Sequence, residues 1–190
     1  MKLHYNFFFI LSAAKQKLYL AVLFQQVNCA DNCIAQVGVK AALPHINSTA
    51  VLGKPQGIDF LIDCIRENEI YEKSFFLIVG SGTEYGKLRE YFDNEKPKNA
   101  KLMGHLPKRA YEMLVNSCDV GLIFLDRRFT IPNFPSRILP YMQASMPVLA
   151  ATDVNTDVGK VIKEGCFGFW CESGDLLSFN NWLTSYVIGN

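Results

Sequence analysis

The sequence lacks a long apolar run, an excess of charge of either sign and a pair of cysteines or histidines at metal-ligand spacing. Its 190 residues carry 19 Lys and Arg against 18 Asp and Glu, a net charge of +1. Because nucleic-acid-binding domains carry a basic surface, this balance predicts no nucleic-acid partner. The apolar stretches near the N-terminus are shorter than the roughly 20 residues that cross a bilayer. The length itself fits one ordinary domain.

Zinc and redox motifs are also missing, although the chain contains cysteine. The six cysteines are Cys29, Cys33, Cys64, Cys118, Cys166 and Cys171. None of them forms a C-x-x-C pair, and the three histidines are far apart in sequence. A chain of this size buries a core without disulfides. We therefore expect buried free thiols, no metal, no cofactor and a reducing, cytoplasmic location.

The first 52 residues show no regular periodicity. Two short apolar runs, "FFFILSAA" and "LYLAVLF", are separated by "KQK". Lys2 and the small residues after the first run would suit a secretory signal, but a structural element or an edge lying on a membrane is the preferred interpretation. The sequence thus predicts an atypical N-terminal segment over 1–52, a remnant or linker with possible membrane association, and a regular domain over 53–190.

Apolar runs and amphipathic stretches alternate from about residue 55 onward. Strands are predicted at 74–82, 100–106, 119–125, 147–152 and 167–173. Helices are predicted at 57–70, 83–95, 108–118, 136–145, 157–165 and 175–188. This alternation is typical of an α/β fold whose parallel sheet is covered on both faces. Ligands of such sheets bind outside the carboxyl ends of the strands, so the turns there are the candidate sites.

The first two turns are rich in small residues. Gly80, Gly82 and Gly86 in "VGSGTEYG" resemble G-x-G-x-x-G, but the last spacing is longer than in a dinucleotide-binding fingerprint. Glycines allow a ligand to approach the backbone closely, and a tight turn without a ligand fits equally well. In "MGHLPKR", Gly104 precedes His105, which is either an ordinary surface histidine or part of a turn that contacts a flat base.

The third turn, "LDRRFTIPNFPSR", combines prolines, a serine and arginines. Pro135 fits the start of a helix, Ser136 can cap it, and the free N–H groups of the first turn would bind an anion. The planar fork of Arg137 suits phosphate, so this turn predicts a diphosphate site. A capped helix with a solvated arginine is the alternative. The "DRR" at 126–128 is interpreted as a solvated face.

The fourth turn, "TDVNTDVG", places two carboxylates close together. Asp153 and Asp157 could bind a metal or the hydroxyl groups of a sugar. Asx residues at this density are also typical of a helix start, and the preferred interpretation makes Asp157 the N-cap of the next helix.

Three segments in order resemble group 1 glycosyltransferases (family 4): "FFLIVGSGTEYGKLREYF", "AKLMGHLPKRAYEMLVNSCDVGLIFL" and "NFPSRILPYMQASMPVLAATD". Members of that family have the GT-B architecture of two Rossmann-like domains, and the likeness covers the C-terminal domain, residues 53–190. The phrases "PNFPSR" and "TDVNTDVG" look closest to transferases of capsule and O-antigen assembly, including N-acetyl-fucosamine transferases. The resemblance implies a Rossmann-like three-layer α/β sandwich with a parallel sheet, one half of a GT-B enzyme.

The resemblance also implies a function, the transfer of a sugar from a UDP-linked donor to a lipid-linked glycan. This reaction would occur at the inner face of the membrane and needs no metal in the family. By analogy, the donor-binding residues are Gly80, Ser81 and Gly82 near the donor, Gly104, His105 and Leu106 beside the base, and Ser136 and Arg137 at the diphosphate. No catalytic residue is implied.

Two departures from the family pattern limit this analogy. The E-x7-E motif of many members is absent, because its aligned positions hold Pro132 and Pro140, and sugar recognition is left unassigned. The N-terminal acceptor domain and the basic residues before "GKPQG" are not recognisable, with Lys54 a weak candidate. We therefore expect activity only with an N-terminal partner half or in a homo-oligomer. A truncated, inactive nucleotide-binding or interaction domain is the alternative.

Overall fold

A computed structural model describes residues 18–24, 54–70, 74–128 and 134–188 of the chain. The strands are β1 (Leu18–Phe24), β2 (Ser74–Gly80), β3 (Ala100–Met103), β4 (Val120–Phe124), β5 (Val148–Thr152) and β6 (Gly168–Glu172). The α-helices are α1 (Ile58–Glu67), α2 (Tyr85–Glu95), α3 (Lys108–Asn116), α4 (Ile138–Gln143), α5 (Val158–Gly165) and α6 (Leu176–Ile188). Two short 3₁₀ helices, η1 (Lys54–Gln56) and η2 (Asn68–Ile70), flank α1.

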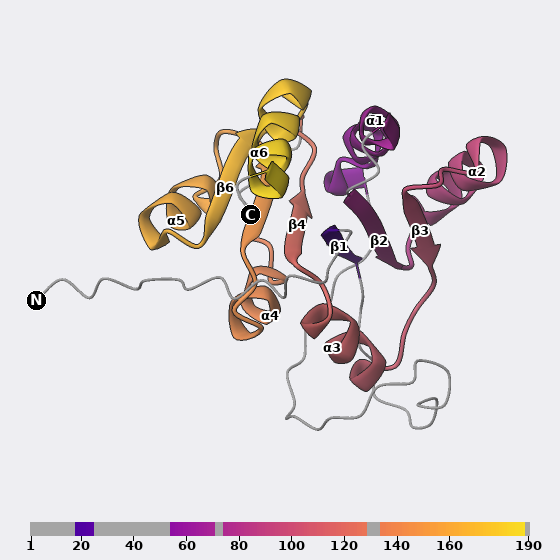
Figure 1. The fold of residues 1–190 in the computed structure, drawn as a ribbon, viewed down its shortest axis with the longest axis horizontal. Coiled ribbons are helices and arrows are strands. Elements are labelled where there is room, and N and C mark those ends of the chain that lie inside the picture. Colours follow the sequence, from indigo (N-terminus) through magenta and orange to yellow (C-terminus); the bar gives the residue numbers. More distant parts are fainter. Residues whose placement is uncertain (1–17, 25–53, 71–73, 129–133, 189–190) are drawn as a thin grey trace, which may run out of the picture.

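The six strands form one parallel sheet in the order β3-β2-β1-β4-β5-β6 (Figure 1). The chain first winds outward from β1 to β3 and then returns across β1 to continue with β4. This order is that of the Rossmann fold, whose topological switch point lies between β1 and β4. The predicted α/β fold with a parallel sheet is therefore confirmed.

The central strand comes from the segment that the sequence analysis separated from the domain. Leu18–Phe24 pairs with β2 along its whole length, from Leu18 opposite Ser74 to Phe24 opposite Gly80. Its other edge pairs with β4, where Leu20 lies opposite Val120. The predicted boundary between 52 and 53 is thus wrong for this strand, which belongs to the same sheet. The rest of the predicted segment, 1–17 and 25–52, lies outside the described residues.

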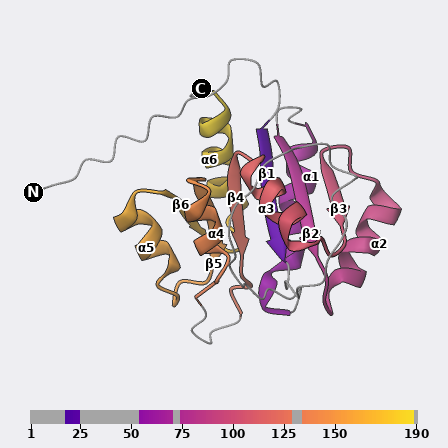
Figure 2. The same cartoon turned by 90° about the horizontal axis from the view of Figure 1, so that it is seen from below.

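Helices cover both faces of the sheet. In Figure 1, α1, α2 and α6 lie above the strands and α3 and α4 below them; seen from below, α3 and α4 stand in front of the sheet (Figure 2). The upper core contains Leu122 and Phe124 of β4, whereas Ile123 belongs to the lower core, between the sheet and α3, α4 and α5. Because alternate side chains enter opposite cores, such a strand reads as a continuous apolar run.

The predicted helices are confirmed, although several are shorter than expected. The expected helix over 136–145 is reduced to Ile138–Gln143. Its end is fixed by Ser145, whose φ of 52° is left-handed, and the N–H of Met146 donates to the carbonyl of Tyr141. This pattern is a Schellman-type helix end. None of the described helices has the length and apolarity to cross a bilayer.

The prediction of buried free thiols is confirmed for two of the described cysteines. Cys64 and Cys171 are buried, and burial raises the pKa of the Cys171 thiol to about 12. Cys118 is half-buried and Cys166 is exposed, so the prediction is wrong for Cys166. Cys29 and Cys33 lie outside the described residues.

Candidate functional site

The turn after β2 connects a buried strand directly to α2. Gly80 ends the strand and is buried, while Ser81 and Gly82 are exposed. The φ of Gly82 is +146°, a conformation that strongly favours glycine, and its carbonyl accepts the N–H of Tyr85 at 3.2 Å. The exposed part of this turn, Ser81 and Gly82, therefore lies at the carboxyl edge of the sheet.

The turn after β3 lies beside the start of α2. Gly104 and His105 are exposed. Leu106 is half-buried and packs against the core between the sheet and α3, α4 and α5. Among the described residues, a Cβ atom at Gly104 would meet nothing nearer than the hydroxyl of Tyr85, at 4.0 Å. The first two predicted turns thus lie side by side, and no other described residue lies over Gly104.

The start of α4 differs from the prediction. The N-cap position is Arg137 and not Ser136, and no side chain caps the helix. The N–H groups of Ile138 and Leu139 already donate to the carbonyls of Pro135 and Ser136, each at 3.2 Å. Ser136 is exposed, but α4 has only six residues and its first donors are satisfied. The predicted anion site at a free helix start is therefore wrong in its geometry.

Arg137 is buried rather than solvated. Only 4% of the residue is exposed, and its Nη2 donates to Oε1 of Gln56 at 2.5 Å. Burial lowers the pKa of the guanidinium, while the neighbouring Tyr141 and Tyr111 raise it by a smaller amount. The same burial raises the pKa of Tyr111 to about 12. Arg137 thus fixes a loop within the fold, and direct contact with a diphosphate stays a prediction.

The segment around η1 lies on the end of β4. The N–H of Asp126 donates to the carbonyl of Pro55 at 2.8 Å. Gly57 has a φ of +58°, and a Cβ atom there would lie 3.1 Å from the carbonyl carbon of Leu125. A larger residue at position 57 would meet both backbone strain and a backbone contact, so glycine permits this approach. Lys54, the weak basic candidate, begins η1.

The turn after β5 is organised by Asp153 and not by Asp157. Asp153 is buried, and its Oδ1 accepts the N–H groups of Asn155 at 2.8 Å and Thr156 at 3.1 Å. Asp157 occupies the N-cap position of α5 as predicted, but its side chain makes no capping hydrogen bond. Among the described residues, no group of three or more His, Cys, Asp or Glu side chains could hold a metal ion.

A cavity of about 570 Å³ opens between α1, the loop after β4 and the turn after β6. This volume is within the usual range for small-molecule sites. Charged side chains dominate the lining: Asp59, Asp63, Arg66, Glu67, Asp126, Arg127 and Arg128. None of the eight residues predicted to bind the donor lines it, although the loop after β4 also carries Ser136 and Arg137.

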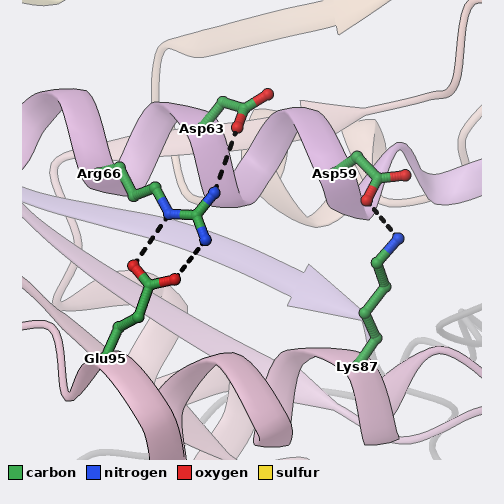
Figure 3. Close-up of polar contacts among 5 residues, drawn as sticks. All are labelled: Asp59, Asp63, Arg66, Lys87 and Glu95. Carbon is green, nitrogen blue, oxygen red and sulfur yellow. Dashed lines mark hydrogen bonds and ion pairs between the residues drawn. The ribbon is translucent and has the colours of Figure 1, made fainter.

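Most charges on one wall of this cavity are paired. Figure 3 shows α1 and α2 joined by Asp59 with Lys87 and by Arg66 with Glu95, while Arg66 also approaches Asp63 at 3.7 Å. The hydrogen bond from Arg66 lowers the pKa of Glu95. These groups are largely exposed, so the pairs contribute little to stability.

The loop after β4 contributes a further ion pair and an exposed arginine. Arg128 donates to both carboxylate oxygens of Asp126, from Nε at 2.9 Å and from Nη2 at 2.5 Å, and this contact lowers the pKa of Asp126. In the described part of the chain, Arg127 has no hydrogen bond or close ion pair, but its charge also lowers the pKa of Asp126. Sequence reasoning assigned 126–128 to a solvated face, because nothing local distinguishes these charges from ordinary surface charges.

Comparison with known proteins places this arrangement in context. No family model matches the sequence. A curated relative, the probable glycosyltransferase WbjE of Pseudomonas aeruginosa, is 24% identical over 124 residues, which are 65% of this chain and 31% of the relative. The chain thus spans about a third of that protein.

Solved structures match nearly the whole chain. Anabaena HepE in complex with UDP aligns over 90% of this chain and 40% of its own, with a TM-score of 0.59 and 16% identity. The pneumococcal O-GlcNAc transferase GtfA with UDP and GlcNAc aligns over 93% of this chain and 30% of its own, with a TM-score of 0.62 and 16% identity. The fold is that of one Rossmann-like half of a GT-B glycosyltransferase. Because the sequence identity is only 16%, this likeness shows the fold alone.

Proposed function

We propose that this chain is the nucleotide-sugar-binding half of a glycosyltransferase. The observation that carries the proposal is a parallel sheet with the strand order of the Rossmann fold, whose carboxyl edge has exposed glycines, Gly82 and Gly104, in the turns after β2 and β3. This fold is shared with glycosyltransferases solved with UDP. Ligands of such sheets bind at that edge. The donor in this proposal is a UDP-linked sugar.

Three of the four predicted turns have a role in the proposal. Ser81 and Gly82 are exposed and would allow the donor to approach the backbone, and the buried Gly80 would hold the end of β2 behind them. The backbone from Gly104 to Leu106, with His105 between them, flanks the base. Ser136 faces the diphosphate from the loop after β4.

Arg137 enters the proposal in a changed role. Since it is buried and bonded to Gln56, we assign it to fixing the loop before α4 and not to direct phosphate contact. This role supports the site because a preorganised loop loses little entropy when a ligand binds.

The chemistry supported by this site is electrostatic. Negative charge develops on the leaving diphosphate during sugar transfer, and fixed donors that meet it lower the barrier. Orienting the acceptor against the donor is worth roughly 7–11 kcal/mol of barrier. Transfer therefore requires a second wall for the acceptor, from another domain, a partner chain or a second copy.

The finer proposal concerns the acceptor. The phrases "PNFPSR" and "TDVNTDVG" favour assembly of capsule or O-antigen polysaccharide on a lipid carrier, with an N-acetyl-fucosamine-type donor. The enzyme would then work at the inner face of the membrane without spanning it. Transfer of labelled sugar from UDP-linked donors into a lipid extract tests this part.

A second candidate is a nucleotide-binding domain without transferase activity. It is favoured by prolines at 132 and 140, where the family's carboxylates would contact the donor. The two candidates share donor binding and differ in turnover. Binding of UDP-sugars without transfer, even with added membranes, would select the second.

Calorimetric titration of the full chain with UDP and UDP-N-acetylhexosamines tests the common core of both candidates. The informative variant is Gly104→Leu, because a Cβ atom there meets no described residue nearer than 4.0 Å and the longer side chain would cover the expected base site. The control is Gly86→Ala in α2, where a Cβ atom meets no described residue within 4 Å. We expect saturable binding that is weakened by Gly104→Leu and unchanged by Gly86→Ala. Absence of binding at millimolar UDP would sink the proposal.

A further inference from the structure

We propose that the face of the sheet covered by α3, α4 and α5 docks on an anionic lipid bilayer, with the exposed apolar side chains of α4 against the lipid. This inference goes beyond donor binding and does not depend on it.

The outer side of α4 is apolar. Leu139 is 55% exposed and Met142 is 48% exposed. Because positions i and i+3 share one side of a helix, these two side chains form one surface, called here the α4 surface. Phe134, which is 50% exposed, lies just before the helix. Apolar side chains exposed singly are ordinary, whereas several on one short segment indicate a contact surface.

Charge is absent from the exposed side of this segment. Between residues 129 and 147 the only charged side chain is that of Arg137, which is buried and donates to Gln56. The solvent side of a surface helix is usually charged or polar. The α4 surface therefore has the composition of a covered surface, although no described segment of the chain covers it.

Basic residues flank the α4 surface. The helices α3 and α5 pack with α4 on the lower core, and α3 and α4 stand in front of the sheet in Figure 2. These three helices contain four basic residues, Lys108, Arg109, Lys160 and Lys163, and two acidic ones, Glu112 and Glu164. On the opposite face, α1 and α2 contain six acidic and three basic residues, and α6 contains neither. The α4 surface thus lies on the face whose helices are positively charged.

This combination favours an anionic bilayer as the occupant. The cytoplasmic surface of a membrane is negatively charged, and each Lys or Arg close to it strengthens attachment. Apolar side chains of a helix that lies on a membrane enter the boundary between headgroups and acyl chains. A second copy docked through the same surface would bring two positive faces together, which opposes association.

Docking through the α4 surface would also bring the candidate site to the membrane. Ser136, in the loop after β4, lies three residues before Leu139. The proposed donor site and the α4 surface therefore share one short segment. Together with the proposed function, this arrangement would present a lipid-linked acceptor to the carboxyl edge of the sheet.

Flotation of the full chain with lipid vesicles, without nucleotide, tests the inference. Vesicles of phosphatidylglycerol and phosphatidylethanolamine supply an anionic surface, and vesicles of phosphatidylcholine supply a neutral one. The double substitution Leu139→Gln, Met142→Gln removes the proposed apolar contact. Leu177→Gln is the matched control, because this leucine is 72% exposed and belongs to α6 on the opposite face.

We expect the double variant to bind anionic vesicles roughly 10-fold or more weakly, and the control less than about twofold, since only the first loses apolar area buried in the lipid. Circular dichroism checks that the variants are folded, and Met142→Gln alone replaces the double variant if it is not.

The charge of this face has its own test. Lys160→Gln should weaken binding to anionic vesicles by about fivefold and leave binding to phosphatidylcholine unchanged, because a basic residue near an anionic surface is lost. Arg89→Gln on α2 removes one positive charge from the opposite face and should have no effect. Equal weakening by the two substitutions would indicate a general charge effect and contradict the orientation.

Three further results would overturn the inference. The wild type could fail to float with anionic vesicles, which would leave the donor-binding proposal untouched. Equal flotation of the wild type and the double variant would place the membrane contact elsewhere in the chain. A wild-type dimer in sedimentation equilibrium that the double substitution dissociates, without vesicle binding, would assign the α4 surface to a second copy.

Discussion

The Nη2 atom of Arg137 donates to Oε1 of Gln56 at 2.5 Å, and both side chains are buried. This contact connects the loop before α4 to η1, across 81 residues of sequence. Burying a charged group without such an acceptor would leave the free-energy cost of its desolvation uncompensated. The pair therefore fixes the relative position of two segments at the carboxyl edge.

Gln56→Ala should lower the free energy of unfolding by about 1–3 kcal/mol, because the substitution removes an acceptor from a buried guanidinium. Urea denaturation at neutral pH measures this effect. Gln143→Ala, on the exposed side of α4, is the control and should change stability by less than about 0.5 kcal/mol. Equal effects of the two substitutions would contradict the importance of the buried contact.

Asp153→Ala should destabilise the chain by about 1–3 kcal/mol, since a buried carboxylate that accepts two backbone N–H groups is lost. Asp157→Ala should cost less than about 0.5 kcal/mol, because its side chain caps nothing. Thermal or urea unfolding of both variants measures which substitution lowers the stability more. If Asp157→Ala were the more damaging change, the sequence-based assignment of the cap would be right and the observed geometry wrong.

Gly121→Ala should destabilise the fold by about 1–3 kcal/mol through overpacking. A Cβ atom there would lie 2.5 Å from the ring of Tyr141, which is fully buried and held by a hydrogen bond from its hydroxyl to the carbonyl of Leu122. Gly86→Ala, on open helix surface, should instead be neutral or stabilising by up to about 1 kcal/mol. Circular dichroism melting curves compare the two, and a neutral Gly121→Ala would refute the close packing.

Stability should fall at alkaline pH. Burial raises the pKa values of Cys171 and Tyr111 to about 12, from reference values of 9.0 and 10.0. The folded state therefore keeps protons that the unfolded state has lost, so this contribution is complete below pH 9 and decreases as the pH rises toward 12. The slope approaches about 1.4 kcal/mol per pH unit for each such group.

Urea unfolding between pH 7 and pH 11 measures this decline. Cys171→Ala should reduce the slope above pH 9, whatever its effect at pH 7. A free energy of unfolding that stays constant to pH 11 would contradict the burial of these groups.

The sequence determined the elements of this fold because its local patterns are strong. β4 and β5 are apolar on both faces, and amphipathic helices separate the strands from residue 58 onward. These patterns depend on neighbours within about ten residues. The glycine turns after β2 and β3 could be located from the same information.

Tertiary structure alone decided the contacts between distant segments. "LYLAVLF" reads equally well as an isolated apolar run, and only pairing with β2 and β4 makes it the central strand. Arg127 and Arg137 both follow β4 in the sequence. Arg137 is buried and donates to Gln56, whereas Arg127 lies near Gly174 and lines a cavity. Whether a charged side chain is buried, paired or open to a ligand depends on segments brought together by the sheet, and local sequence does not contain that information.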